Sequence, residues 1–136
     1  MSPTAFALLG YIAWALIILV MLAGLRTSKV MSRQKAPNSF SPLGDDVGDF
    51  GKRLTRVHAN CYENLAIAAS LMLYAIATGQ TAATDSLAYI FLAARVGQSV
   101  VHLMSTSNNF VRIRFFLFVA QNLILVFWVL KLFGVF

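Results

Sequence analysis

One short stretch of the chain, Arg56–Leu65 (RVHANCYENL), carries side chains that could bind a small charged molecule. At about 100° per helical residue, its guanidinium, amide and carboxylate groups fall within an arc of about 100°. Such a combination suits a small anionic ligand that also has an amine. His58 and Tyr62 fall on the other side of the helix. The residues on the shared face are Arg53, Arg56, Asn60, Glu63 and Asn64.

A second polar stripe follows in the next apolar segment, where Arg95, Gln98 and His102 are spaced i, i+3 and i+7. Glu63 lies about 10 Å further along its helix than Arg56, which places its carboxylate near the hydrocarbon edge of a bilayer. A lone carboxylate inside a membrane costs about 3 kcal/mol on insertion scales, so Glu63 needs a partner. Arg95 is expected at a similar depth on the antiparallel neighbour. We therefore predict a Glu63–Arg95 ion pair.

A third group of polar residues opens the last apolar segment, with Arg112 and Arg114 at its start and Gln121 and Asn122 deeper. On a helix Arg114 and Gln121 share a face, whereas Arg112 points away from them. Two interpretations stay open for the stripes together. They line a ligand cavity, or they are structural polar groups that hold helices in register. The two histidines lie on different helices, and no metal site is predicted.

The composition is that of a membrane protein. Of the 136 residues, 59% are hydrophobic and 12% are charged, and the mean hydropathy is +0.73. A soluble domain of this size would expose much of that apolar surface, whereas a bilayer covers it. The net charge of +6 is carried by basic residues separated by long apolar runs. This pattern favours the basic loops of a membrane protein over nucleic-acid binding.

The length and the apolar runs predict a single domain, residues 1–136, of the all-α class. A membrane span needs about 20 mostly apolar residues, and four segments meet that requirement. Pro3 suits the first turn of a helix, and Gly79 suits the end of one. We therefore expect an up-down bundle of four transmembrane helices. The spans are predicted at about 5–25, 57–78, 86–105 and 111–136.

The distribution of basic residues predicts the orientation. Seven of the eleven Lys and Arg lie between Arg26 and Arg56, in the first connection, at about 26–56. The second connection has no basic residue and carries Asp85. The positive-inside rule then places the first and third connections in the cytoplasm and both termini on the non-cytoplasmic side. Short loops and the lack of a recognisable targeting signal favour the bacterial inner membrane over the endoplasmic reticulum.

The stretch RVHANCYEN resembles the second-helix motif of the MAPEG family, the membrane-associated proteins in eicosanoid and glutathione metabolism. That motif reads Arg-x-His-x-Asn-x-x-Glu, and it matches at Arg56, His58, Asn60 and Glu63. Arg95 matches the family's arginine in the third helix, and the resemblance covers nearly the whole chain. It implies a homotrimer that binds glutathione between neighbouring protomers, on the cytoplasmic side.

The resemblance also implies roles for single residues. In the eicosanoid-forming members an arginine at the start of the fourth helix stabilises the thiolate, and Arg112 and Arg114 both compete for that match. Phe116 or Phe118 stands where those members carry Tyr, so eicosanoid synthesis is not carried over. Carried over, Arg56, Asn60 and Glu63 would hold glutathione, with Arg53 or Arg26 assisting. The polar stripe of the third helix adds Arg95, Gln98 and His102 to the expected glutathione-binding residues, although Gln98 and His102 stand where prostaglandin E synthase-like members carry His or Tyr.

The predicted function is a glutathione-dependent transferase or peroxidase acting on hydrophobic electrophiles or lipid hydroperoxides dissolved in the membrane. A thiol with a pKa of about 8.5 is mostly protonated at neutral pH, and a nearby arginine favours its anion. One alternative is a non-catalytic membrane protein of the same architecture that binds lipids or organises partners. Another is a small transporter, because buried Glu, Arg and His also mark translocation paths.

Overall fold

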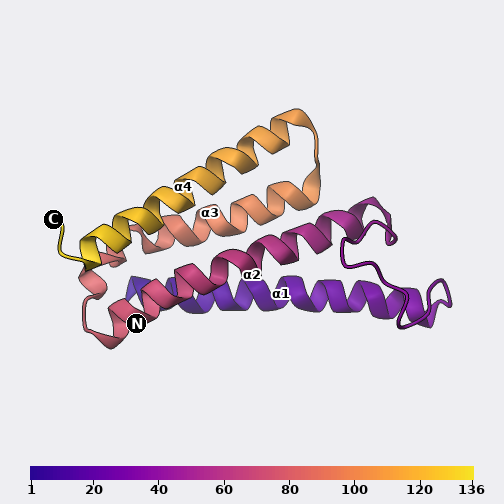
Figure 1. The fold of residues 1–136 in the computed structure, drawn as a ribbon, viewed down its shortest axis with the longest axis horizontal. Helices are drawn as coiled ribbons and strands as arrows, with labels where there is room; N and C mark the ends of the chain where they lie inside the picture. The colour runs from indigo at the N-terminus through magenta and orange to yellow at the C-terminus, as the bar shows by residue number, and fades with distance from the viewer.

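The computed structural model describes all residues from Met1 to Phe136 and contains four long helices and one short 3₁₀ turn. The helices run alternately up and down, and α3 lies between α4 and the α1–α2 pair (Figure 1). Both termini lie at the end that holds the α2–α3 turn, opposite the long α1–α2 loop (Figure 1). The predicted all-α class and alternating course are confirmed. The elements are α1 Pro3–Met31, α2 Gly48–Ala77, η1 Thr81–Ala83, α3 Asp85–Met104 and α4 Asn108–Leu132.

The first two helices extend beyond the predicted spans and shorten the loop between them to residues 32–47. Ser2 caps the amino terminus of α1, because its hydroxyl accepts a hydrogen bond from the Ala5 N–H at 3.1 Å. It continues past Arg26 because neither glycine nor proline occurs between Arg26 and Pro37. The longer α2 includes Arg53 and Arg56, so the polar face of this helix begins about one turn before the predicted span.

Three helices, α1, α3 and α4, are long and apolar enough to cross a membrane. Helix α2 is not among them, although a span was predicted at 57–78. The reason is its amino-terminal half, where Asn60, Glu63 and Asn64 lower the hydropathy that the later residues supply. The other three helices are consistent with an integral membrane protein.

The core is divided into two apolar clusters that explain where the bundle opens. The first draws on all four helices near the end that holds the termini, and includes Tyr11, Met72, Phe91 and Trp128. The second draws only on α1 and α2, near the 32–47 loop, and consists of Ile18, Leu22, Leu54, Val57 and Cys61. Because α4 contributes nothing to the second cluster, its first turns diverge from α2 (Figure 1).

A buried polar contact ties the start of α1 to the start of α3. The Asp85 carboxylate accepts hydrogen bonds from the Thr4 N–H at 3.0 Å and the Thr4 hydroxyl at 2.6 Å. The Thr4 hydroxyl also lies 2.6 Å from the hydroxyl of Thr84, and both threonines are fully buried. The carboxylate thereby satisfies a donor at the amino terminus of α1 that has no partner within the helix.

We expect Asp85→Ala to lower the free energy of unfolding by about 1.5–3 kcal/mol, because hydrogen bonds to a charged acceptor are lost. Thermal melting of the purified protein in detergent measures this loss. The matched control is Asp45→Ala, in which an exposed loop carboxylate is removed. Equal melting temperatures for the two variants would show that the Thr4 contact contributes nothing.

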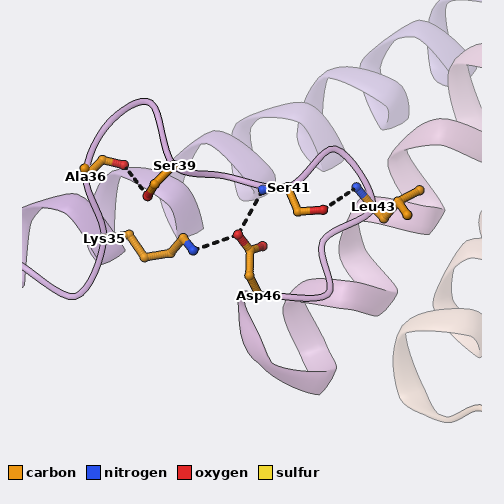
Figure 2. Close-up of polar contacts among 6 residues, drawn as sticks. All are labelled: Lys35, Ala36, Ser39, Ser41, Leu43 and Asp46. Carbon is orange, nitrogen blue, oxygen red and sulfur yellow. Dashed lines mark hydrogen bonds and ion pairs between the residues drawn. The ribbon is translucent and has the colours of Figure 1, made fainter.

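The 32–47 loop is held together by its own polar contacts (Figure 2). The Lys35 ammonium lies 2.7 Å from the Asp46 carboxylate, which also accepts a hydrogen bond from the Ser41 N–H at 2.9 Å. The Ser39 hydroxyl donates to the carbonyl of Ala36 at 2.8 Å. The hydrogen bond from Lys35, followed by that from Ser41, lowers the pKa of the Asp46 carboxyl.

Because the folded loop lowers this pKa, the Asp46 contacts are complete at neutral pH and are lost as the pH falls through the lowered value. We therefore expect amide hydrogen exchange in residues 32–47, corrected for its intrinsic pH dependence, to accelerate below about pH 4. Asp46→Asn should show the same fast exchange at pH 7, whereas Asp45→Asn should not. Exchange rates that are insensitive to both changes would contradict this account of the loop.

Candidate functional site

A cavity of about 400 Å³ opens between α2, α3 and α4 at the end near the 32–47 loop. It lies where α4 diverges from α2, so no core cluster fills it. One side of the cavity is polar and comes mainly from α2 and α3, and the other is apolar and comes from α4. The lining residues are Arg56, Ala59, Asn60, Glu63, Gln98, His102, Val111, Arg114, Phe115 and Phe118.

Helix α2 contributes Arg56, Asn60 and Glu63 to the cavity. Their spacing of four and three residues puts them on one face, as helical periodicity requires. Three of the five residues predicted on this face therefore share the cavity, whereas Arg53 and Asn64 do not line it. His58, on the other side, packs its ring against Tyr62 with 5.3 Å between centroids and does not reach the cavity.

Helices α3 and α4 complete the polar side with Gln98, His102 and Arg114. His102 is 8% exposed, and its Nε2 atom has no hydrogen-bond partner in the protein. Arg114 lines the cavity, whereas Arg112 is exposed and lies outside it. Of the two arginines that competed for one role, only Arg114 is placed to act on a molecule bound in this cavity.

Three arginines of the predicted site lie apart from the cavity. Arg26 lies over the ring of Phe40 at 5.7 Å and lines a separate cavity beside the loop. Arg53 donates a hydrogen bond to the carbonyl of Leu103 at 2.9 Å, so it binds the last turn of α3 instead. Arg112 is directed away from the cavity, as the helical spacing predicted.

The predicted Glu63–Arg95 ion pair is wrong. Glu63 lines the cavity and is exposed, while Arg95 is 1% exposed and lies behind the cavity wall. The Arg95 guanidinium donates instead to the side-chain oxygens of Asn60 and Gln98. Asn60 of the neighbouring helix α2 and Gln98, one turn further along α3, accept the guanidinium hydrogens in place of Glu63.

Arg95 belongs to a polar network that reaches all four helices. It donates to the Tyr11 hydroxyl of α1 at 3.4 Å, and this hydroxyl donates to the carbonyl of Cys61 in α2 at 2.8 Å. From α4, Gln121 donates to Gln98 at 2.8 Å. The part that Tyr11 plays in this network was not predicted. A single tyrosine in an apolar run forms no repeating pattern, so the sequence does not distinguish it from an aromatic residue of the core.

The apolar side of the cavity is formed by Val111, Phe115 and Phe118 of α4, which are all exposed hydrophobic residues. At the other side, a smaller cavity of about 190 Å³ shares Arg56 and Ala59 with the first and extends to the 32–47 loop. The site is therefore continuous with the polar loop end of the molecule and with the apolar surface of α4.

A family model describing the MAPEG family matches residues 4–134 of the chain. The chain belongs to the MAPEG family. The match includes all four helices apart from Pro3, and every residue that lines the cavity. Searches of curated proteins and of solved structures find no match. Membership of the MAPEG family fits a role in glutathione-related or eicosanoid metabolism.

Proposed function

We propose that the protein is a glutathione-dependent transferase that acts on hydrophobic electrophiles dissolved in the membrane. The observation that supports it most is one cavity with Arg56, Glu63 and Arg114 on its polar side and an aromatic wall from α4. A water-soluble thiol can enter from the loop end, and a lipophilic substrate can enter from the membrane. Membership of the MAPEG family supports the choice of glutathione as the thiol.

The cavity residues fit the functional groups of glutathione. Glutathione carries two carboxylates, one ammonium and one thiol. The arginines offer planar donors for carboxylates, and Glu63 is the only acidic residue in the cavity lining, so it is suited to the ammonium. Arg114 lies beside Phe115 and Phe118 on α4, where a thiolate would meet a substrate that enters from the lipid.

In the proposed reaction the thiol first loses its proton to water, because the Arg114 guanidinium favours the anion. The sulfur then attacks the electrophilic carbon and forms a carbon–sulfur bond, while the leaving group departs with its electron pair. With a lipid hydroperoxide, the sulfur attacks the outer oxygen and releases the alcohol. A second glutathione then reacts with the sulfenic acid and gives the disulfide and water.

The proposal includes four membrane crossings, with α2 as the fourth, both termini on the non-cytoplasmic side and a homotrimer. The basic residues around the 32–47 loop support the orientation through the positive-inside rule. The exposed apolar residues of α4 around the cavity support a neighbouring protomer that closes it. Neutral or paired surroundings for the polar half of α2 would lower the cost of its membrane insertion.

Calorimetric titration with glutathione and turnover of a lipophilic nitroaryl chloride, both on protein in nanodiscs, test this function. We expect saturable binding and an aryl thioether product. Binding without product would favour a non-catalytic binding protein, and no binding would contradict the assignment to glutathione. S-Methylglutathione is the matched control ligand, because it keeps the charged groups and cannot form a thiolate.

A further inference from the structure

The most deeply buried charge of the molecule has no counter-ion. Arg95 is 1% exposed in the middle of α3, and the only ion pair in the chain joins Lys35 to Asp46. A buried charge without a partner of opposite sign is costly, unless polar groups replace the lost water. The neutral oxygens of Asn60, Gln98 and Tyr11 accept hydrogen bonds from its two terminal nitrogens, whereas its Nε atom is buried without a partner.

A guanidinium group can only donate hydrogen bonds, so every atom turned toward it must be an acceptor. The side-chain oxygen of Asn60 and the Gln98 Oε1 atom, at 2.7 Å, therefore face Arg95. Gln98 Oε1 also accepts a hydrogen bond from Gln121 Nε2 at 2.8 Å. That Nε2 atom in turn donates to the carbonyls of Ala94 and Leu117 at 3.3 and 2.9 Å. The orientation of both amides is fixed from behind the cavity wall.

Because the side-chain oxygens of Asn60 and Gln98 accept hydrogen bonds from Arg95, their NH₂ groups must point away from the guanidinium. Both residues line the cavity, so the NH₂ groups are available to a ligand there. Neither NH₂ group is among the side-chain atoms that are sealed from solvent without a partner, a set that includes His102 Nε2. The cavity wall thus offers two amide donors in addition to Arg56 and Arg114, which line the same cavity. All four of these side chains offer hydrogens to a ligand.

We propose that Arg95 is a positioning residue that turns the NH₂ groups of Asn60 and Gln98 into the cavity, where they bind an anionic group of the ligand. This inference rests on the proposed function, in which the anion is the thiolate or a carboxylate of glutathione. The positioning role also explains why Arg95 has no counter-ion. A carboxylate in place of either amide would neutralise Arg95, but it would present negative charge to the bound anion.

The substitution Gln98→Glu tests this role because it preserves both observed contacts. The new carboxylate can still accept from Arg95 and from Gln121, and the substitution replaces only the cavity-facing NH₂ group with an oxygen. We expect the melting temperature to rise by a few degrees, because the buried guanidinium gains a counter-ion. The affinity for glutathione should fall about 10- to 100-fold, as for a lost hydrogen bond to a charged group. Asn60→Asp should behave in the same way.

A purely structural role for Gln98 would move stability and affinity in the same direction, whereas positioning moves them in opposite directions. The matched control is Gln80→Glu, the same change at an exposed residue of the α2–α3 turn. This turn lies at the end of the bundle opposite the α1–α2 loop (Figure 1). The affinity of this control for glutathione should match that of the wild type. Comparison with S-methylglutathione identifies the anion. If the loss is confined to glutathione, the amides bind the thiolate, and if both ligands lose affinity, they bind a carboxylate.

Two results would overturn the inference. One is a Gln98→Glu protein that binds glutathione like the wild type, and the other is one that melts below it. If wild-type protein bound no glutathione, the proposed function would fail. The melting temperatures of Gln98→Glu and Asn60→Asp would then still decide whether Arg95 binds the side-chain oxygens at positions 60 and 98, because the melting measurement needs no ligand.

Discussion

Replacing Arg114 with alanine should abolish most of the transferase activity. We expect a loss of about 10²- to 10³-fold in kcat, the effect of removing one donor from a developing or bound anion. The loss should appear in kcat more than in KM, because the guanidinium acts on the sulfur and other residues hold the rest of glutathione. Steady-state turnover of a lipophilic electrophile in nanodiscs measures both constants.

Arg112→Ala is the matched control, since it removes the same side chain two residues away from an exposed position outside the cavity. Its activity should change by no more than about fivefold, because exposed charges contribute at most about 1 kcal/mol. A larger loss for Arg112→Ala than for Arg114→Ala would mean that α4 faces the site differently from the arrangement described. Helical spacing alone left these two arginines in competition, and their positions in the fold separate them.

Glu63→Gln should weaken the binding of glutathione about 10- to 100-fold, because a charge-assisted hydrogen bond to the ammonium is lost. Glu63 is the only acidic residue in a lining that holds Arg56 and Arg114. A glutathione analogue that lacks the ammonium should bind to Glu63→Gln as well as it binds to the wild type, or better. The four affinities form a double cycle that isolates the contact.

Asp49→Asn controls for the general change in charge, because it replaces an exposed carboxylate in the first turn of α2 with an amide. It should bind both ligands like the wild type. If Glu63→Gln weakened glutathione and the analogue equally, the carboxylate would have no specific contact with the ammonium. Glu63 would then support the cavity through its neighbours, and the assigned orientation of glutathione would be wrong.

Much of the fold could be predicted from the apolar runs and from the residues that end them. Length, hydropathy and Gly79 predicted the four helices and their alternating course, and the ends of α3 lie close to the prediction. The extension of α2 to Gly48 was missed, because the polar residues after that glycine read as a loop. Tertiary contacts made there, such as that of Leu54 in the second core cluster, favour the helix.

The polar face of α2 could be predicted because a helix sorts residues by angle alone. That arithmetic placed Arg56, Asn60 and Glu63 together, and they share one cavity. It could not choose between partners for Arg95, because angle and depth do not say how far a side chain extends. The guanidinium reached Asn60 and Gln98 instead of Glu63.

Contacts between distant parts of the chain left no pattern in the sequence. Thr4 and Asp85 are joined by two hydrogen bonds, and nothing in the spacing of either residue indicates the other. The same holds for Tyr11, whose hydroxyl links α1 to the network behind the cavity. Such pairs arise from the packing of whole helices, so only the folded chain identifies them.

The ultraviolet absorbance of a bound thiolate tests most directly whether this cavity binds glutathione as its thiolate. Wild-type protein saturated with glutathione should show thiolate absorbance at pH 7, with an apparent pKa well below the value of about 8.5 for a free thiol. S-Methylglutathione should displace this signal. Saturable binding with the pKa of free glutathione would contradict the claim.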